Sequence, residues 1–149
     1  MNDFPLFEVA ELLPHTGGMI WLDKVLAWDE ETATAELTVR TGPLFGGGDT
    51  VPAWAGIEYM AQTIGLYAGL HAKRAGEPIR LGFLLGTRRF ESSAPGFRIG
   101  SVLTVRVEKI MQDGHLSVFD CRLTGDHVKV SAVLNVYQAP LDTIMHYEK

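Results

Sequence analysis

The sequence has a single cysteine, Cys121, among its 149 residues. One cysteine excludes an internal disulfide and every metal or redox motif built on a Cys-x-x-Cys pair, so we expect Cys121 to pack inside a strand. His71, His115, His127 and His146 show no metal-ligand spacing relative to one another, and we expect them to lie on the surface. No metal or organic cofactor is implied.

Positive charge is also scarce. The sequence has 13 Lys and Arg against 18 Asp and Glu, a net charge of −5. This balance argues against non-specific nucleic-acid binding, which requires a basic face. Charged residues make up 21% and hydrophobic residues 46%, which is a high apolar share for a small domain. We therefore expect part of the surface to be covered in an oligomer, with a homodimer as the first expectation.

We also expect no secretory signal and no membrane span. The first residues, Met1 to Pro5, carry an acid and a proline where a secretory signal has basic residues. The longest apolar segment, residues 51–74, is interrupted by Glu58, Gln62 and several glycines, which is untypical of a membrane span. We expect a cytoplasmic protein, and the length fits one domain over residues 1–149.

Residues 51–74 predict one long helix, around which the rest of the chain is organised. Pro52 suits the first helical turn, and Gly76 follows Lys73 and Arg74 as a stop signal. The apolar residues go nearly all round this helix, so we expect most of its circumference to be buried. Ala61, Gly65 and Gly69 recur every four residues along a ridge with little side-chain bulk, where another backbone can approach closely. Glu58 is the anomaly, because a carboxylate is costly to bury unless it is paired, neutralised or used.

The segments on either side of this helix predict an antiparallel sheet. Residues 4–13 predict a short amphipathic helix, followed by a β-hairpin over 19–28 and 34–40. After the long helix the periodicity changes to two, which predicts four further strands, at 80–90, 102–110, 116–123 and 128–137. Only a sheet curled round one hydrophobic helix buries that helix on most sides. The fold class is therefore α+β, with the hot-dog arrangement of about six strands.

Three segments carry a family resemblance. They are Leu12-Leu-Pro-His-Thr-Gly-Gly-Met-Ile-Trp-Leu-Asp23, the helix from Pro52 through Ile57-Glu58-Tyr-Met-Ala-Gln62, and Gly82-Phe-Leu-Leu-Gly86 to Phe90 with Pro95 and Gly100. With these motifs in this order, nearly the whole chain resembles the β-hydroxyacyl-acyl-carrier-protein dehydratases of fatty-acid synthesis. It is more similar still to the dehydratase-like proteins of aryl-polyene and related type II polyketide clusters. The resemblance implies the hot-dog fold, a catalytic carboxylate at Glu58, and an acyl tunnel walled by the first and third segments.

One departure from this family stands out. The family's catalytic histidine lies in a Gly-His-Phe-Pro loop just before the helix, where this chain has Phe45-Gly-Gly-Gly-Asp-Thr-Val51. No histidine lies between His15 and His71. The usual catalytic pair is therefore incomplete in its usual place.

Dehydration of a β-hydroxyacyl thioester needs a base for the C2 proton, an acid for the leaving hydroxyl and donors for the developing oxyanion. Burial keeps a carboxyl protonated near neutral pH, so we predict Glu58 as the acid. The plainer alternative is a core carboxyl satisfied by backbone or by a partner subunit. His15 is the best available base, although the resemblance makes it a wall residue in the wider family. Asp49 is a weaker candidate, with an ordinary loop role as its alternative.

Substrate-binding residues are predicted on both sides of the helix start. Free N–H groups from Ala53 to Gly56 suit the thioester oxygen, because a first helical turn has unpaired donors and a positive dipole end. Gln62 lies one turn after Glu58 and either orients that carboxyl or bonds to nearby backbone. The resemblance adds the tunnel residues Pro14, Gly82, Phe83 and Leu84.

Six of the thirteen cations gather around the helix end and the next strand. They are Lys73, Arg74, Arg80, Arg88, Arg89 and Arg98. A basic rim of this kind suits docking of an acidic carrier protein. The alternative is that the two helical cations complement the helix dipole and the arginines pair with surface acids.

The first functional prediction is a hot-dog dimer, homodimeric or heterodimeric, that dehydrates β-hydroxyacyl thioesters on an acyl carrier protein. Two alternatives stay open. In a hot-dog acyl thioesterase, Glu58 activates water without any histidine. In a non-catalytic partner subunit, the chain stabilises an active dehydratase by forming a heterodimer. The missing histidine loop favours the two alternatives, whereas His15 and the tunnel segments favour the dehydratase.

Overall fold

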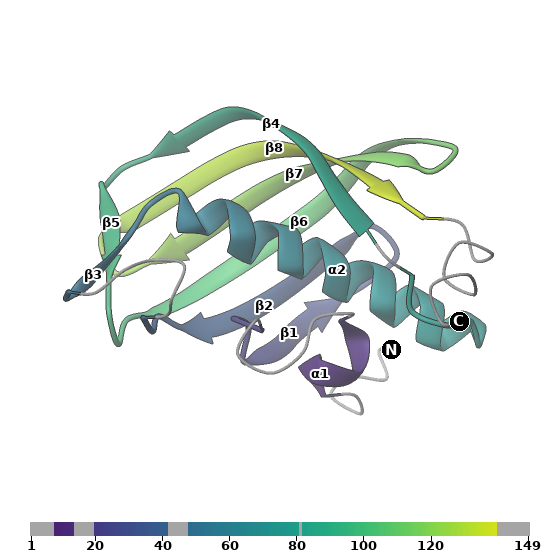
Figure 1. Ribbon diagram of the computed structural model, residues 1–149, viewed down its shortest axis with the longest axis horizontal. Helices are drawn as coiled ribbons and strands as arrows, with labels where there is room; N and C mark the ends of the chain where they lie inside the picture. Colours follow the sequence, from purple (N-terminus) through teal and green to yellow (C-terminus); the bar gives the residue numbers. More distant parts are fainter. Residues whose placement is uncertain (1–7, 14–19, 42–47, 81, 140–149) are drawn as a thin grey trace.

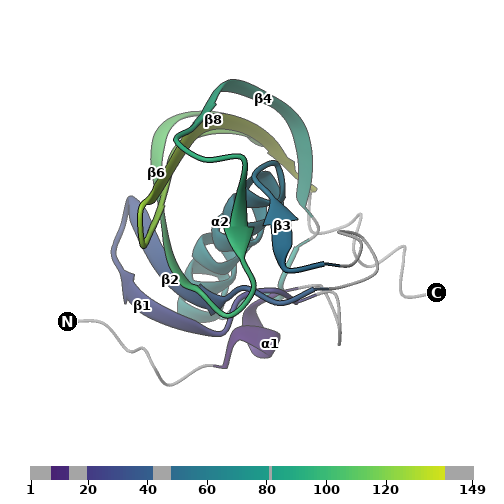
Figure 2. The same cartoon turned by 90° about the vertical axis from the view of Figure 1, so that its left-hand side faces the viewer.

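A six-stranded antiparallel sheet curves round one long helix in the computed structural model, which describes residues 8–13, 20–41, 48–80 and 82–139. The helices are α1 (Val9–Leu12) and α2 (Ala55–Ala75). The strands are β1 (Lys24–Trp28), β2 (Thr32–Thr38), β3 (Thr50–Pro52), β4 (Gly82–Ser92), β5 (Gly96–Arg98), β6 (Val102–Asp113), β7 (Leu116–Gly125) and β8 (Val128–Gln138). The end-on view in Figure 2 shows α2 inside the curve of the sheet. This is the hot-dog arrangement that the sequence predicts.

The main sheet has the strand order β1-β2-β6-β7-β8-β4, so β1 and β4 are its two edges (Figure 1). Its hairpins follow the predicted turn signals. Asp29 Oδ1 accepts hydrogen bonds from the N–H groups of Glu31 and Thr32 between β1 and β2. Gly114, at φ +63°, closes the β6–β7 turn as the Asp-Gly pair predicts.

The core lies between α2 and the inward side chains of β2, β6, β7 and β8, where period-two strands place every second residue. Leu37, Leu103, Cys121 and Leu134 are each at most 1% exposed. The predicted burial of Cys121 in a strand is therefore confirmed. Among the described residues, no helix is long and apolar enough to cross a membrane.

The small-residue ridge of α2 receives α1, as predicted. A Cβ atom added to Gly69 would overlap the carbonyl oxygen of Leu12, and one added to Gly65 would lie 2.8 Å from the Leu13 side chain. Glycine at these two positions allows the backbone of α1 to lie directly on α2. The ridge thus fixes the chain just before the Leu-Pro-His segment against the central helix.

The start of α2 differs from the prediction. Pro52 does not occupy a first helical turn; Thr50–Pro52 forms β3, which pairs with β5 in a separate two-stranded sheet, and α2 begins at Ala55. The end of α2 agrees with the prediction, since Gly76 caps the helix at φ +73° and its N–H bonds to the carbonyl of Lys73.

Candidate active site

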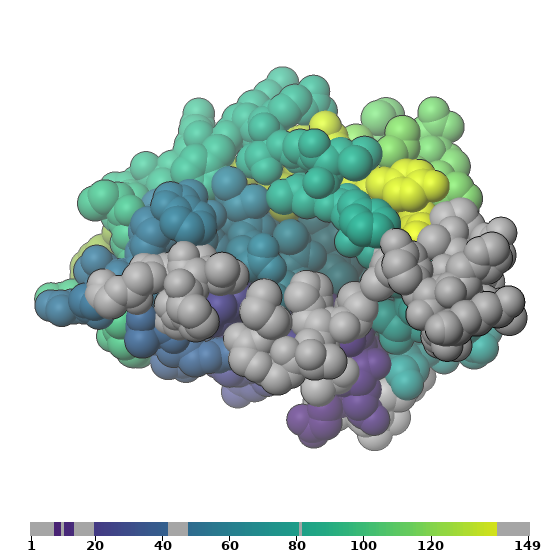
Figure 3. Space-filling model, viewed as in Figure 1, coloured from purple at the N-terminus to yellow at the C-terminus, as the bar shows by residue number. Residues whose placement is uncertain are grey.

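A groove of about 610 Å³ follows one side of α2 from Glu58 to Ala75. Its floor along the helix consists largely of small residues, including Ala61, Gly65 and Ala68. Its opposite wall comes from the start of β4 and from the inward faces of β6, β7 and β8. In the space-filling view, atoms of α2 lie at the bottom of a recess beneath β4 (Figure 3). A groove of this length and narrow floor suits an extended chain.

Glu58 lies at the N-terminal end of this groove and is half-buried. It sits in the first turn of α2, where the positive end of the helix dipole favours a carboxylate. Gln62, one turn later, is fully buried and donates a hydrogen bond from Nε2 to Glu58 Oε2 at 3.4 Å. The predicted contact between Gln62 and Glu58 is therefore present.

Gln62 also accepts a hydrogen bond at Oε1 from the backbone N–H of Trp21, at 2.9 Å. Both alternatives for Gln62 thus hold, because one amide bonds to a carboxyl and to backbone. The Trp21 segment is in turn held by Arg40, whose Nη1 donates to the Trp21 carbonyl at 3.3 Å. The Arg40 guanidinium also lies 5.2 Å from the centre of the Trp21 ring. Arg40 therefore supports Glu58 indirectly, a role that the sequence did not indicate.

The N–H groups of Ala53 and Gly56, two of the predicted oxyanion donors, are already bonded to carbonyl groups of the chain. Ala53 N–H donates to the carbonyl of Pro95 at 2.8 Å, and Gly56 N–H donates to the carbonyl of Ala53 at 2.9 Å. Gly56 also faces the core, since an added Cβ would meet Phe97, Leu123 and Val130 at 3.5 to 3.8 Å. The β3–β5 pairing causes this outcome, because it draws the chain before α2 into the ladder.

The tunnel residues Gly82, Phe83 and Leu84 line the groove and are exposed at its rim. The structure therefore brings them together with Glu58 on one cavity. Pro14 and His15, the other predicted site residues, lie outside the described residues. Asp49 is exposed, and it does not line the described part of the groove.

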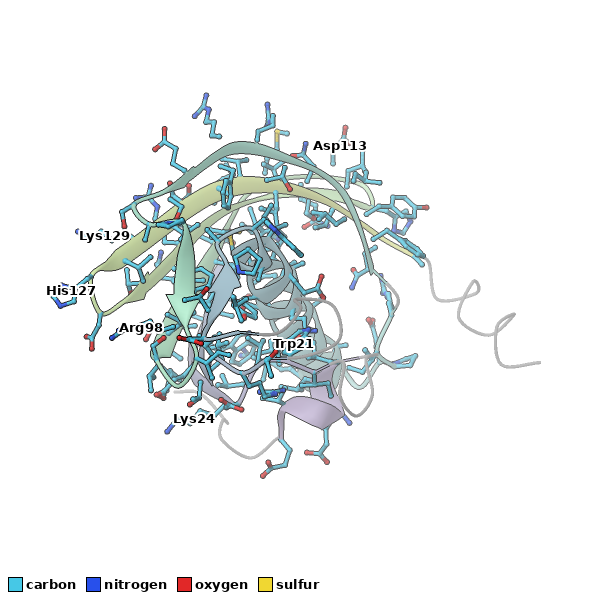
Figure 4. The ribbon with its side chains drawn as sticks, turned by 60° about the vertical axis from the view of Figure 1, so that its left-hand side comes forward. Trp21, Lys24, Arg98, Asp113, His127 and Lys129 are labelled. Atoms are coloured by element: carbon cyan, nitrogen blue, oxygen red, sulfur yellow. The ribbon has the colours of Figure 1, made fainter. Side chains whose placement is uncertain are left out.

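Five of the six clustered cations, the arginines, divide into two groups. Arg74 pairs with Glu30 at 3.7 Å and Arg80 with Glu77 at 3.1 Å, as the plainer interpretation predicts. Arg88, Arg89 and Arg98 are exposed and form no ion pair within the described residues. Arg98 ends β5, which pairs with β3 just before α2, and its side chain extends outward (Figure 4). The unpaired positive charge therefore lies toward the Glu58 end of the molecule.

The far end of the groove has a polar lining that the sequence did not predict. His71 is not a surface residue; it is half-buried, and its ring centre lies 4.4 Å from that of Tyr67 and 5.2 Å from that of Trp28. Burial lowers the pKa of His71 below its ordinary value. Tyr67 donates a hydrogen bond to the Glu30 carbonyl at 2.5 Å. Burial and the nearby Glu31 and Glu30 carboxylates raise the pKa of Tyr67 to about 12, so this phenol stays protonated.

Lys109 lies opposite Phe119 on β7, and paired residues of neighbouring strands point to the same face of a sheet. Since Phe119 is buried, Lys109 also points inward, toward α2. Its Nζ lies 5.7 Å from the centre of the Tyr67 ring and donates to Gln112 Oε1 at 2.6 Å. Within the described part of the chain, no three His, Cys, Asp or Glu side chains are grouped to hold a metal ion.

Residues 7–147 of the chain match the model of the ApeP-like family, described as ApeP dehydratase. No curated protein matches the chain. Among solved structures, the dehydratase heterocomplex ApeI:P from Xenorhabdus doucetiae is 32% identical, with a TM-score of 0.84. That match covers 96% of this chain and 98% of the other.

More distant structures share the fold alone. A hypothetical thioesterase protein with coenzyme A from Streptococcus pneumoniae is 12% identical, with a TM-score of 0.59, over 79% of this chain and 86% of the other. The PaaI protein from Escherichia coli is 15% identical, with a TM-score of 0.57, over 77% of this chain and 81% of the other.

Proposed function

Because the chain belongs to the ApeP-like dehydratase family, we propose that it dehydrates β-hydroxyacyl thioesters on an acyl carrier protein. Membership makes the chain a dehydratase, which is a lyase. The pathway proposed for it is the synthesis of an aryl polyene or a related type II polyketide, in the cytoplasm. One observation supports the proposal most directly. Glu58, which is hydrogen-bonded to Gln62, lies at the N-terminal end of a groove long enough for an acyl chain.

In the proposed reaction, Glu58 is the general acid. A base removes the proton at C2, the bond between C3 and its hydroxyl breaks, and Glu58 gives its proton to the departing hydroxyl, which leaves as water. The product is an enoyl thioester. The proton held by the base then returns to Glu58 to complete the cycle. Gln62 is a positioning residue in this scheme, because its amide holds the carboxyl toward the groove.

His15 stays the proposed base. Among the described residues that line the groove, His71 is the only histidine, and it lies thirteen positions after Glu58 on the same helix. That separation is about 20 Å along the helix axis, too far for both side chains to reach one carbon and its neighbour. We therefore keep the Leu-Pro-His segment, or a second subunit, as the proposed source of the base.

A second hot-dog subunit is the proposed partner, and β4 is the proposed contact. β4 is an edge strand of 11 residues whose exposed residues include Phe83, Leu84 and Leu85, with Leu85 59% exposed. The opposite edge, β1, has 5 residues and begins with Lys24, a residue type that protects edges from pairing. A long apolar edge is the better surface for an added strand. The ApeI:P match supports two different subunits rather than two copies.

The unpaired arginines are the proposed contact for the carrier protein. Arg88, Arg89 and Arg98 lie on β4 and β5, toward the end of the molecule where α2 begins. A carrier protein is acidic and must deliver its thioester close to Glu58. The direction of the groove agrees with this delivery, since it leads from Glu58 away from these arginines.

Two observations favour one of the alternative functions. If the chain is a non-catalytic partner subunit, the absence of the usual histidine loop and the match to a heterocomplex are both explained. A thioesterase is the other alternative, and Glu58 at the head of an acyl groove is compatible with it.

The test is enoyl formation from a β-hydroxyacyl carrier-protein thioester, with thiol release followed in the same tube. Three samples are compared: this chain alone, this chain with its partner hot-dog subunit, and the partner alone. Enoyl product that requires this chain and appears without free thiol supports the proposal. Thiol release instead of enoyl product would identify a thioesterase. Equal enoyl formation by the partner alone would reduce this chain to a structural subunit.

The proposed contact has its own test, in which Leu85→Glu on β4 is compared with Leu26→Glu on β1. Both leucines are exposed on edge strands, at 59% and 39%. We expect Leu85→Glu to separate the two subunits on size-exclusion chromatography, while Leu26→Glu leaves them together. Separation by Leu26→Glu alone would place the partner on β1.

A further inference from the structure

Arg40 lies just after β2, where the backbone is fixed by its neighbours. The N–H of Val39 donates to the carbonyl of Ser101 at 2.8 Å, and the Val39 carbonyl accepts from the N–H of Gly100 at 2.8 Å. The Arg40 side chain pairs with Asp23 at 3.6 Å, and both side chains are close to half exposed. An exposed ion pair contributes little by itself, so this pair alone gives Arg40 no special role.

Three further contacts of Arg40 go to the segment before β1. Nη2 donates to the carbonyl of Ile20, Nη1 donates to the carbonyl of Trp21 at 3.3 Å, and the guanidinium lies 5.2 Å from the centre of the Trp21 ring. The planar fork of an arginine can bond two acceptors at once. A lysine ammonium, with a single nitrogen, does not reproduce this arrangement.

One of these carbonyls belongs to a peptide group that also bonds to the active site. The Ile20 carbonyl and the Trp21 N–H are the two polar ends of one planar peptide group. This N–H donates to Gln62 Oε1 at 2.9 Å, and Gln62 Nε2 donates to Glu58 Oε2 at 3.4 Å. Arg40 therefore begins a chain of three hydrogen bonds that passes through two amides and ends at the proposed acid.

Every bond in this chain has the same direction. A peptide N–H cannot accept a hydrogen bond, so the Gln62 oxygen faces Trp21 and its nitrogen faces Glu58. Because an amide nitrogen only donates, Glu58 Oε2 is an acceptor. When Glu58 is protonated, its hydrogen is then on the other oxygen, Oε1. A cation at the start of the chain also polarises both amides, which strengthens the last donor.

We propose that Arg40 is a positioning residue for the dehydration, because it holds the Gln62 amide in the orientation that places the acidic proton of Glu58 on Oε1. The guanidinium fixes the peptide group between Ile20 and Trp21, this peptide group fixes Gln62, and Gln62 fixes the carboxyl. In the reaction, a base takes the C2 proton, the bond between C3 and its hydroxyl breaks, and the proton on Oε1 passes to that hydroxyl, which leaves as water. This inference rests on the proposed function, since it takes Glu58 as the acid.

The first test compares Arg40→Met and Arg40→Lys with Arg122→Met in the two-subunit enzyme. Arg122 is the matched control, because it is exposed on β7 and its ion pair, to Asp120 at 3.2 Å, lies on the outer face of the sheet. We expect Arg40→Met to lower kcat by about tenfold with KM nearly unchanged, since the residue acts on the transition state. Arg40→Lys should not restore kcat, and Arg122→Met should keep the native value.

A double-mutant cycle tests whether Arg40 acts through Gln62. Gln62→Leu removes the amide, so adding Arg40→Met should lower kcat by less than about twofold more. Two independent effects would instead multiply to about 100-fold, and Arg40 would then act by another route. Native kcat in Arg40→Met, full kcat in Arg40→Lys, or multiplied effects would each overturn the inference.

A neutron structure of the two-subunit enzyme tests the chain without any turnover, because it shows the deuterium atoms on the Gln62 amide. The inference requires deuterium on Nε2 directed at Glu58 Oε2, and the Trp21 N–D directed at Gln62 Oε1. An amide turned the other way would overturn it. If the substrate is dehydrated but the amide is turned, or Arg40→Met keeps the native kcat, the proposed function stands and this inference is wrong. If no substrate is dehydrated, the proposed function is wrong, whatever the orientation of the amide.

Discussion

The groove beside α2 is lined by Glu58 at one end and by His71 at the other, and the two side chains have different surroundings. Glu58 lies in the first turn of α2, hydrogen-bonded to a buried amide, at the end where Arg88, Arg89 and Arg98 form no ion pair within the described residues. His71 lies between three and four turns later, packed between aromatic rings. The first arrangement holds a group for chemistry. The second places a polar side chain in the wall of the groove.

The sequence alone indicates Glu58 as a site residue, but it does not indicate His71. Glu58 stands out because no other charged residue lies within the apolar part of the helix. His71 does not stand out, because Lys73 and Arg74 follow it and the pattern is that of a solvated last turn. Its burial depends on Trp28 and on the β6–β7 hairpin, which are distant in sequence.

The largest contrast between the two ends is expected in turnover. Glu58→Gln should lower kcat of the two-subunit enzyme by about 100-fold or more, because a general acid typically contributes 10² to 10⁴. His15→Ala should lower it similarly if His15 is the base. The measurement is enoyl formation under saturating substrate, with thermal unfolding to verify that the variants fold.

Glu108→Gln is the control for Glu58→Gln. Glu108 follows the buried Val107 on β6 and pairs with Arg106, outside the groove. The kcat of Glu108→Gln should equal that of the native protein. If Glu58→Gln kept full activity, Glu58 would not be the general acid.

Adding a methyl group to α2 should change the free energy of unfolding differently at its two ends. Gly69→Ala should lower the free energy of unfolding by about 2 kcal/mol, since its Cβ would overlap the Leu12 carbonyl and force α1 away. Gly56→Ala should be neutral or stabilising by up to about 1 kcal/mol, because its Cβ meets only ordinary contacts and alanine favours a helix. Chemical denaturation measures both. Equal effects would mean that α1 does not fix this end of the helix.

A smaller effect on turnover is expected from the residue that holds Glu58. Gln62→Leu should lower kcat by about tenfold and leave KM nearly unchanged, because the carboxyl loses the amide that positions it. Some stability should also be lost, since the Trp21 N–H is left without its acceptor. The comparison is Thr63→Val, which removes a buried hydroxyl bonded only to the Tyr59 carbonyl among the described residues. An unchanged kcat in Gln62→Leu, with stability lost, would mean that Gln62 has only a structural role.

The smallest effect concerns pH. Burial lowers the pKa of His71 below the ordinary value of 6.5, so below about pH 6.5 the unfolded chain binds a proton that the folded chain does not. The free energy of unfolding should therefore fall as the pH falls through this window. His71→Asn should show a shallower fall between about pH 8 and about pH 5, measured by thermal unfolding. His127→Asn, at an exposed turn, should keep the native slope; an unchanged slope in His71→Asn would contradict the burial of its imidazole.

Much of the fold could be predicted from the sequence because local patterns determine it. Period-two alternation marks β6, β7 and β8, and Gly76 and Asp113-Gly114 mark a helix end and a turn. The β3–β5 pair could not be predicted, since three-residue strands have no period and Pro52 suits a helix start as well as a strand. That pairing is also why the donors predicted at Ala53 and Gly56 are engaged.

The site divides in the same way. Glu58 and its contact with Gln62 lie one helical turn apart, so spacing alone suggests them. The bond between Gln62 and Trp21 spans 41 positions, and the polar end of the groove combines β6, β7 and α2. Such contacts arise from the curvature of the sheet, which no local pattern specifies.

The most direct measurement is a crystal structure of the two-subunit complex with an unreactive 3-hydroxyacyl pantetheine amide. The account predicts one acyl chain along α2, with its C3 hydroxyl within hydrogen-bond distance of Glu58. An acyl chain that enters the partner subunit instead, with the groove beside α2 left open, would contradict it.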